Sequence, residues 1–411
     1  MQVLEELKQR GIFKQISNLE KFQKLDPKTT GVYIGFDPTA KSLHLGNYVQ
    51  ISILKRFKNA GFKAYAILGG ATGMIGDPSF KDAERSLLDK KTLEMNKNAI
   101  KKQLEHFGLE VIDNYEFYKN MNILEFLRDV GKLVNISYML SKDSVANRID
   151  NGLSFTEFSY QLLQGWDFYN LYKKHNIFVQ LGGSDQWGNI TTGLEVISKL
   201  EGDNHKAVVI TSNLLVDENG KKYGKSTGGG SLWLDKNMNS PYNLYQFLFN
   251  QPDSKIEELL FWLTFLPINK IKTIISKHNE NPSLHYAQEI LASEVVKDIH
   301  NKEELEIAKK VTNILFDKKY DLSSLDLKTL EKMEIYLPLL EVSLNVNLID
   351  KLIEEKVLLS KREAREFINN NALKIDGKEI DENYLFSPQF YSKKYAFLHK
   401  GKKQVFLLKT K

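Results

Sequence analysis

The chain has no cysteine among its 411 residues. Disulfide bonds, zinc sites with thiolate ligands and cysteine nucleophiles are therefore excluded. Long hydrophobic runs are also missing, because the longest candidate, residues 259–266, stops at Pro267, well short of the roughly 18 to 20 residues that a membrane-spanning helix needs. The eight histidines show none of the pairing typical of a zinc protease. We therefore expect no membrane association and a chemistry performed by hydroxyl, amide, carboxylate, lysine and backbone groups.

Residues 1–16 lack the apolar stretch and small-residue cleavage site of a signal peptide. They have instead the pattern of a charged amphipathic helix, so we expect a cytoplasmic protein. Hydrophobic residues make up 42% of the chain and charged residues 27%, which is typical of a soluble globular protein. The length favours two or three domains.

The excess of positive charge lies at the C-terminal end. The formal net charge is +5, and residues 347–411 hold 14 Lys and Arg against 9 Asp and Glu, so that residues 1–346 are neutral. Residues 383–411 hold seven lysines and no acidic residue, with aromatic side chains between them. Such a segment favours contact with a polyanion, of which nucleic acid is the obvious one. A solvated lysine face on a small sheet is the alternative.

Strand-like and helix-like segments alternate through the first part of the chain. Short β-branched and aromatic runs predict strands at residues 31–36, 62–68, 111–118, 177–181 and 207–211. Periodic apolar positions predict helices at residues 47–60, 87–107, 122–130, 154–172 and 187–200. This alternation predicts an α/β fold with a doubly wound, Rossmann-like parallel sheet.

The alternation ends near residue 235. Ser240 followed by Pro241 is typical of a helix N-terminus, and the pattern stays helical to about residue 316. Weaker periodicity follows before the basic tail. We therefore expect a doubly wound domain, an all-α domain, a linker and a small α+β domain, at residues 1–235, 236–320, 321–346 and 347–411.

Loops at the carboxyl ends of parallel strands are the usual ligand sites of such a sheet. The first of these loops ends in the run from His44 to Asn47 at a helix N-terminus, where backbone N–H groups and the helix dipole favour phosphate. The second surrounds Asp77 with four glycines and lacks the lysine of a Walker A loop. Its carboxylate could receive an ammonium group. An incidental histidine and a turn capped by Asp77 are the structural alternatives.

Three further segments carry polar groups. Tyr160, Gln164 and Asp167 recur on one face of a predicted helix, where they would form either a solvated stripe or the lining of an amino-acid pocket. Asp185 follows two glycines after a predicted strand and could accept hydrogen bonds from ribose hydroxyls. The segment 221–226 reads Lys-Lys-Tyr-Gly-Lys-Ser and suits a mobile clamp on phosphates, with a surface lysine turn as the alternative.

Taken in order, these motifs resemble those of the class I aminoacyl-tRNA synthetases, and most closely those of the bacterial tyrosyl-tRNA synthetases. The motifs are His-Leu-Gly-Asn, Gly-Gly-Ala-Thr-Gly, Gly-Gly-Ser-Asp-Gln-Trp-Gly-Asn and Lys-Tyr-Gly-Lys-Ser. In the tail, residues 360–365 and 376–378 resemble a small RNA-binding module shared with a ribosomal protein of the small subunit. The first domain would then be catalytic and the last would bind RNA.

The resemblance implies a ligase that activates L-tyrosine with ATP and transfers the tyrosyl group to tRNA(Tyr). Mg²⁺ would arrive with the nucleotide, no metal would be bound by the protein itself, and the chain would form a homodimer. Asn47 departs from the family pattern, because it stands where the HIGH signature has its second histidine. Tyr223 and Gly224 also depart from the letters of the KMSKS signature.

The resemblance further implies roles for individual residues. Tyrosine would be bound by Tyr33 and Asp167 at the phenol, by Asp77, Tyr160 and Gln164 at the ammonium group, and by Gln180 and Gln186 around the pocket. ATP would be bound by Gly35, Asp37, Thr39, His44, Gly183, Asp185 and Lys225. Catalysis would involve Thr39, His44, Asn47, Lys222, Lys225 and Ser226. RNA would be bound by Lys361, Arg362, Arg365, Lys393, Lys394, Lys402 and Lys403.

Two alternatives stay open. Tryptophanyl-tRNA synthetases share the fold, but their relatives usually lack such a basic tail, and Tyr33 with Asp167 suits a phenol better than an indole. A non-catalytic RNA-binding protein could also keep the scaffold. The presence of His44, Lys222 and Lys225 argues against it, because a decayed site has no physical reason to keep them.

Overall fold

The computed structural model describes residues 2–77, 88–142, 145, 152–223, 232–316, 322, 325–389, 391–401 and 404–411. The chain divides into two compact units. The first comprises residues 1–234 and 252–287, and the second comprises residues 235–251 and 288–411. Within the described ranges, none of the helices combines the length and the apolar character needed to span a membrane.

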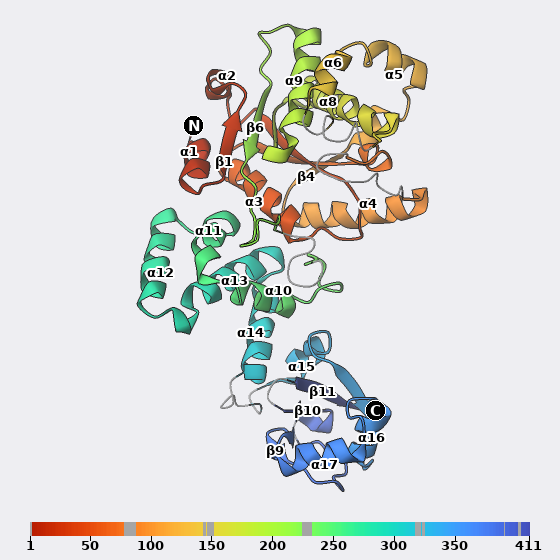
Figure 1. The fold of residues 1–411 in the computed structure, drawn as a ribbon, viewed down its shortest axis with the longest axis vertical. Helices are drawn as coiled ribbons and strands as arrows, with labels where there is room; N and C mark the ends of the chain where they lie inside the picture. The colour runs from red at the N-terminus through yellow and green to blue at the C-terminus, as the bar shows by residue number, and fades with distance from the viewer. Residues whose placement is uncertain are drawn as a thin grey trace. The chain divides into compact units, whose positions relative to one another are not determined.

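A six-stranded sheet in the order β1-β6-β5-β2-β3-β4 forms the centre of the first unit (Figure 1). Its strands are β1 (Phe13–Ile16), β2 (Gly31–Phe36), β3 (Lys63–Leu68), β4 (Glu110–Asp113), β5 (Ile177–Gly183) and β6 (Val208–Ser212). β2 pairs in parallel with β3 and β5, β3 with β4, and β5 with β6. β1 pairs antiparallel with β6. The sheet is therefore mixed and mostly parallel.

Helices cover both faces of this sheet. α3 (Leu45–Asn59) and α4 (Lys90–His106) follow β2 and β3, whereas α8 (Phe155–His175) and α9 (Trp187–Glu201) precede β5 and β6. The two pairs lie on opposite sides of the strands in Figure 1. The direction in which strands are added reverses between β2 and β5, and such a reversal opens a crevice at their carboxyl ends.

Shorter elements complete the first unit. Its other helices are α1 (Gln2–Gln9), α2 (Leu19–Gln23), α5 (Ile123–Asp129), α6 (Ile136–Leu140), α11 (Asp253–Leu263) and α12 (Ile268–Glu280). Its 3₁₀ turns are η1 (Thr72–Met74), η2 (Asn114–Phe117), η3 (Ser184–Gln186) and η4 (Pro282–Leu284). α11 and α12 thus belong with the sheet, although they follow residue 235 in the sequence.

Local sequence signals explain several of these boundaries. The Ser154 hydroxyl accepts the N–H of Glu157 at 3.2 Å, so it caps α8 as the sequence predicted. The predicted strand at residues 31–36 coincides with β2. The helix expected over residues 1–16 is wrong beyond Gln9. Gly11, with φ of 70°, turns the chain there, and β1 follows because β6 offers it a partner.

The second unit combines helices with a five-stranded sheet in the order β7-β11-β10-β8-β9. Its helices are α10 (Pro241–Phe249), most of α13 (Tyr286–Ile299), α14 (Lys302–Phe316), α15 (Leu327–Met333), α16 (Leu348–Glu354) and α17 (Lys361–Asn369). Its strands are β7 (Leu339–Val342), β8 (Leu373–Ile375), β9 (Lys378–Glu379), β10 (Tyr395–Lys400) and β11 (Gln404–Thr410), with the 3₁₀ turn η6 (Tyr391–Lys393) before β10.

Residues 321–346, expected as a linker, include α15 and β7, and β7 pairs in parallel with β11. Val311 of α14 shares one core cluster with Tyr395 and Phe397 of β10. These two aromatic residues lie in the basic segment that suggested nucleic-acid contact, and both are fully buried. Ala396 and Leu398, between and after them, are buried in a second core cluster, so β10 is buried on both faces and these two aromatic rings are not a stacking surface.

Candidate active site

A cavity of about 810 Å³ lies at the carboxyl ends of β2 and β5, where the strand order reverses. It is lined by every residue that the sequence assigned to tyrosine, ATP or catalysis and that the structure describes. These residues are Tyr33, Gly35, Asp37, Thr39, His44, Asn47, Asp77, Tyr160, Gln164, Asp167, Gln180, Gly183, Asp185, Gln186 and Lys222. Lys225 and Ser226 lie outside the described residues.

β2 contributes Tyr33 and Gly35 to the cavity lining. Tyr33 and Gly35 lie two positions apart, so they face the same side of the sheet, and Asp37 follows the strand. Nothing in the described structure lies within 4 Å of the place that a Cβ on Gly35 would occupy. The Asp37 carboxylate accepts hydrogen bonds from the Thr72 hydroxyl at 2.9 Å and the Tyr160 hydroxyl at 3.1 Å. Glycine at position 35 therefore leaves open space near the Asp37 carboxylate, whose position is fixed by these two hydrogen bonds.

The N-terminus of α3 carries the His-Leu-Gly-Asn motif. The His44 backbone N–H donates to Asn47 Oδ1 at 3.0 Å, so Asn47 ties the first turn of the helix to its N-cap. A Cβ on Gly46 would come within 2.7 Å of the Tyr223 carbonyl oxygen. Only glycine lets the lysine-rich segment approach this helix so closely. From that segment, Lys222 Nζ reaches the Asp185 carboxylate at 2.6 Å.

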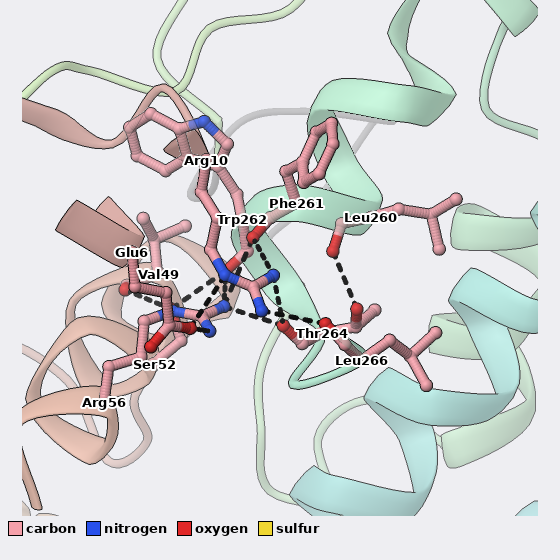
Figure 2. A network of polar contacts seen from close by, with 10 residues as sticks. All are labelled: Glu6, Arg10, Val49, Ser52, Arg56, Leu260, Phe261, Trp262, Thr264 and Leu266. Atoms are coloured by element: carbon pink, nitrogen blue, oxygen red, sulfur yellow. Dashed lines mark hydrogen bonds and ion pairs between the residues drawn. The ribbon is translucent and has the colours of Figure 1, made fainter. Parts of the chain in front are cut away.

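Two buried arginines bind the end of α11: Arg56 holds the far half of α3 against it, and Arg10 holds the end of α1 (Figure 2). Arg56 donates to the Thr264 carbonyl at 2.7 Å, and Arg10 donates to the Leu266 carbonyl at 2.8 Å. Both guanidinium groups also bind the Glu6 carboxylate, at 2.9 and 2.8 Å. Carbonyl groups at a helix C-terminus lack partners within the helix. The two guanidinium groups donate hydrogen bonds to these carbonyls. The contact of Arg56 thereby fixes α3, whose first turn lines the cavity.

Asp167 is a buried carboxylate of α8 at the cavity wall, only 4% exposed. It accepts hydrogen bonds from the Tyr118 hydroxyl at 2.7 Å and from Asn114 Nδ2 at 2.8 Å. Burial raises the pKa of Asp167 to about 7, although both hydrogen bonds act to lower it. Burial, and secondarily the charge of Asp167, raises the pKa of the Tyr33 phenol well above its ordinary value.

Buried polar atoms in the cavity wall lack partners within the described part of the chain: Tyr33 Oη, Gln164 Oε1 and Gln180 Oε1. Buried polar groups normally have partners, so these atoms mark places where a ligand can bind. Asp77 is held differently, because it accepts from Gln186 Nε2 at 3.1 Å and Asn189 Nδ2 at 3.2 Å. The cavity thus presents oriented acceptors suited to a cationic group.

Sequence reasoning missed three residues of this region. Asn114 and Tyr118 both donate to Asp167, and Thr72 donates to Asp37. The predicted strand over residues 111–118 hid the first two, because β4 ends at Asp113 and a 3₁₀ turn follows. The signal that could have found Asn114 is its position just beyond a parallel strand, at the ligand-binding edge of the sheet.

The residues predicted to bind RNA lie in the second unit. Lys361, Arg365 and Lys394 form ion pairs at 2.8 to 2.9 Å with Asp350, Glu382 and Glu331. Arg362 and Lys393 are exposed. Lys402 and Lys403 lie outside the described residues.

Known proteins resemble the chain over its whole length. The family described as tRNA synthetases class I (W and Y) matches residues 26–317, and the tyrosine–tRNA ligase SYY-like C-terminal domain matches residues 330–408. The tyrosine–tRNA ligase of Mycoplasmopsis agalactiae is 60% identical over 100% of both chains. That of Mycoplasmopsis synoviae is 57% identical over 100% of this chain and 99% of its own.

A solved structure shares the fold of the larger part of the chain. The C-terminally truncated mitochondrial tyrosyl-tRNA synthetase of Aspergillus nidulans has a TM-score of 0.69 and 30% identity, and the match covers 76% of this chain and 94% of that one. The mixed, mostly parallel sheet, the cavity at its reversal point and the motifs around that cavity agree with these matches. The chain belongs to the class I tRNA synthetases, and within them to the tyrosine–tRNA ligase family.

Proposed function

We propose that this chain is the tyrosine–tRNA ligase of its organism, and that the cavity of the first unit binds L-tyrosine and ATP. One observation carries the assignment: the buried Tyr33 hydroxyl, unpartnered within the described structure, lines the same cavity as the Asp167 carboxylate. A substrate phenol would donate to Asp167 and accept from Tyr33. Phenylalanine would leave the Tyr33 hydroxyl without a partner and the Asp167 carboxylate with one hydrogen bond fewer, and would therefore bind less well.

The rest of the tyrosine would meet the neighbouring polar groups. Asp77, Tyr160 and Gln164 would bind the ammonium group, while Gln180 and Gln186 would shape the pocket around it. The geometry supports this, since Gln186 already donates to the Asp77 carboxylate and Gln164 has a buried unpaired oxygen among the described residues.

ATP would occupy the part of the cavity beside β2, β5 and the start of α3. Gly35, Asp37, Gly183 and Asp185 would contact adenosine, and Thr39 with His44 would contact the triphosphate at the helix N-terminus. Lys222, together with Lys225 and Ser226, would close on the leaving pyrophosphate. A magnesium ion carried by ATP would supply further positive charge against the phosphates.

The reaction needs alignment more than acid–base chemistry. The tyrosine carboxylate is already ionised and attacks the α-phosphorus, forming a C–O–P link while the bond to pyrophosphate breaks. The terminal ribose hydroxyl of tRNA(Tyr) then attacks the carbonyl carbon and releases AMP. His44, Lys222 and Lys225 would act by stabilising negative charge on the phosphates.

The assignment is tested by exchange of pyrophosphate into ATP and by charging of tRNA(Tyr), both with the full-length protein. We expect exchange that depends on added tyrosine, followed by tyrosylation of the tRNA. Binding of tRNA without exchange by any amino acid would favour the non-catalytic RNA-binding alternative instead.

An exposed apolar surface of the first unit supports a homodimer. Leu124 is 74% exposed, Phe155 71%, Ile123 67% and Ile136 65%. They lie on α5, α6 and the first residue of α8, which pack around one core cluster. Surfaces of this kind mark interfaces, and two-fold dimers are the commonest oligomers.

A Leu124→Asp variant should sediment as a monomer, and a Leu19→Asp variant on the distant helix α2 should stay dimeric. A wild-type protein that sediments as a monomer would contradict the dimer.

We assign tRNA binding to residues 347–411, with Arg362 and Lys393 as exposed cations that are free of the ion pairs described above. Lys361, Arg365, Lys394, Lys402 and Lys403 are the other candidates. Because tRNA is charged where proteins are made, this function places the protein in the cytoplasm.

A further inference from the structure

Residues 232–234, which follow the lysine-rich segment, form a short antiparallel bridge with residues 43–45 at the start of α3. Two backbone N–H groups donate across it: Leu45 to the Leu232 carbonyl at 2.9 Å, and Leu234 to the Leu43 carbonyl at 2.8 Å. These bonds flank His44 and Trp233, which face each other as a non-hydrogen-bonded pair. Such pairs have the closest Cα atoms of an antiparallel ladder, and their side chains meet on one face. The backbone therefore places the Trp233 side chain beside His44.

The rings of His44 and Trp233 are close enough to interact. Their centroids lie 6.3 Å apart and their planes are inclined at 56°, which is within the range of aromatic pairs in proteins. Trp233 is half-buried, and its neighbours Leu232 and Leu234 are buried. His44 lines the cavity, whereas Trp233 is not among the described residues that do so. Any effect of Trp233 on the cavity is therefore transmitted through His44.

The imidazole of His44 also lies against the backbone of Gly46. A Cβ on Gly46 would come within 3.0 Å of His44 Cε1 and 3.1 Å of His44 Nδ1, which is closer than ordinary van der Waals contact. Gly46 and Trp233 thus both lie next to the imidazole, and together they limit the rotamers that it can adopt.

We propose that Trp233 is a positioning residue that holds the His44 imidazole in the orientation in which it meets the triphosphate of ATP. The proposal rests on the function proposed above and adds a residue that lies outside the cavity. Its physical basis is that a group stabilises developing charge best when it is in place before the reaction. Without the tryptophan, the histidine side chain would be free to adopt other rotamers and would have to be ordered during the reaction.

The first test replaces Trp233 with alanine in the full-length protein and measures tyrosyl-adenylate formation by rapid quench. Trp233→Ala should slow this step by about 10- to 100-fold, because His44 would no longer be held in place. The Kd for tyrosine should stay within about twofold of wild type, because His44 is assigned to the phosphates and not to the amino acid. An unchanged rate of adenylate formation would overturn the positioning role.

Two conservative variants separate the aromatic ring from apolar bulk. Trp233→Phe keeps a ring beside His44, so its rate should stay within about threefold of wild type. Trp233→Leu keeps apolar bulk without the flat ring, so we expect a loss of about tenfold. If Trp233→Ala fails to fold, this pair still decides the question, because equal rates in the two variants would overturn the proposal.

A double-variant cycle tests whether the effect passes through His44. Once His44→Ala has removed the imidazole, the further change Trp233→Ala should alter the rate of adenylate formation by less than about twofold. If Trp233→Ala slows the reaction as much in the His44→Ala background as in wild type, Trp233 does not act through His44 and the proposal is overturned.

Phe178→Ala is the matched control. Phe178 is half-buried at the amino-terminal end of β5, whereas the cavity lies at the carboxyl end, and its ring centroid is 5.2 Å from that of Tyr172 at an inclination of 57°. Its loss should lower the unfolding temperature and leave the rate of adenylate formation within about twofold of wild type. A loss of rate as large as that of Trp233→Ala would show that removal of any aromatic pair has this effect, and would overturn the proposal. Failure of the proposed function would look different, because the wild-type protein would then show no tyrosine-dependent exchange at all.

Discussion

In the proposed site, the ionisation of Asp167 controls recognition of the substrate phenol. Burial raises its pKa to about 7, and burial is the largest cause of that shift. Above this pH the carboxylate is ionised and forms a charge-assisted bond with the substrate hydroxyl. Below it, the group holds a proton and that bond is lost. Tyrosine affinity should therefore weaken as the pH falls through 7.

Calorimetric titration at a series of pH values checks this expectation. The Kd for tyrosine should be nearly constant above about pH 8 and should rise toward about tenfold per pH unit below pH 7, the limit for a ligand that binds one ionised group. Asp167→Asn cannot titrate, so its weaker affinity should not follow this curve. A wild-type Kd that stays constant between about pH 5.5 and 8 would contradict the assignment of Asp167 to the phenol.

Lys222 is expected to act on the phosphates and not on the amino acid. Its ammonium group lies 2.6 Å from Asp185, and its side chain is 53% exposed. Lys222→Ala should slow adenylate formation by about 30- to 1,000-fold, which corresponds to about 2 to 4 kcal/mol of transition-state stabilisation. Lys225→Ala should have a similar effect.

Rapid-quench kinetics of tyrosyl-adenylate formation separate this role from binding. The tyrosine Kd should stay within about twofold of wild type in Lys222→Ala. Lys221→Ala, an exposed neighbour, serves as the control and should leave the rate unchanged. A normal rate combined with a weakened tyrosine Kd would place Lys222 in the amino-acid subsite and refute the assignment.

At the scale of elements, the junction of α3 with α11 determines how rigidly the catalytic helix is held. Burial lowers the pKa of Arg56 to about 10, with the charge of Arg10 as the second cause, so Arg56 remains charged at neutral pH. Arg56→Met would leave helix-terminal carbonyls unpaired and Glu6 with one cation fewer. We expect the first unit to lose about 3 to 5 kcal/mol of stability.

Urea unfolding followed by tryptophan fluorescence measures this loss, since Trp262 lies in the same junction and is 2% exposed. Lys58→Met, on the exposed side of α3, is the matched control and should cost less than about 1 kcal/mol. Equal stabilities of the two variants would show that the buried arginines do not hold α3 to α11.

The regular elements could be read from the sequence where their signal is local. β2 and α8 are examples, because a continuous apolar run and a serine cap mark them. β1 and β7 could not be found, since each has only four residues and exists by pairing with a strand distant in sequence. Residues 321–346 were expected as a linker for the same reason, because β7 lies among them and forms only by pairing with β11.

In the candidate site too, residues with a local sequence signal could be predicted, and residues that only folding brings together could not. Residues in the glycine-rich loops could be assigned from the resemblance, because each loop follows a strand at the carboxyl edge of the sheet. Asn114 could not, because its neighbours carry no glycine motif and its hydrogen bonds depend on Ala71, Thr72 and Asp167 meeting in space. Residues that act through other residues leave little trace in a single sequence.

At the scale of the whole molecule, the net positive charge lies in the part of the chain proposed to bind tRNA and outside the part proposed to be catalytic. Residues 1–346 are neutral and residues 347–411 carry the net charge of +5. Truncation near residue 321 would be a poor test of this separation. It would remove Tyr395, Phe397 and Leu407 from the core that they share with α14.

Charge reversal in the intact chain avoids that damage. Arg362→Glu combined with Lys393→Glu should reduce charging of tRNA(Tyr) by about tenfold or more at physiological salt, while pyrophosphate exchange stays unchanged. The salt dependence of tRNA affinity should also become shallower, by up to about 0.7 to 0.9 log units per lost phosphate contact. Lys199→Glu, an exposed cation of α9, is the control. Normal charging by the double variant would show that this face is only solvated.

The selectivity of ATP–pyrophosphate exchange among tyrosine, phenylalanine and tryptophan tests whether Tyr33 and Asp167 recognise the substrate phenol. Phenylalanine leaves the buried Tyr33 hydroxyl without a partner and forms no charge-assisted hydrogen bond with Asp167, at about 2 kcal/mol each, so kcat/KM for tyrosine should exceed that for phenylalanine by about a thousandfold. Tryptophan should be discriminated at least as strongly, because an indole cannot occupy the position of the phenol. Exchange with phenylalanine or tryptophan at a rate comparable to that with tyrosine would show that the cavity does not select for a phenol.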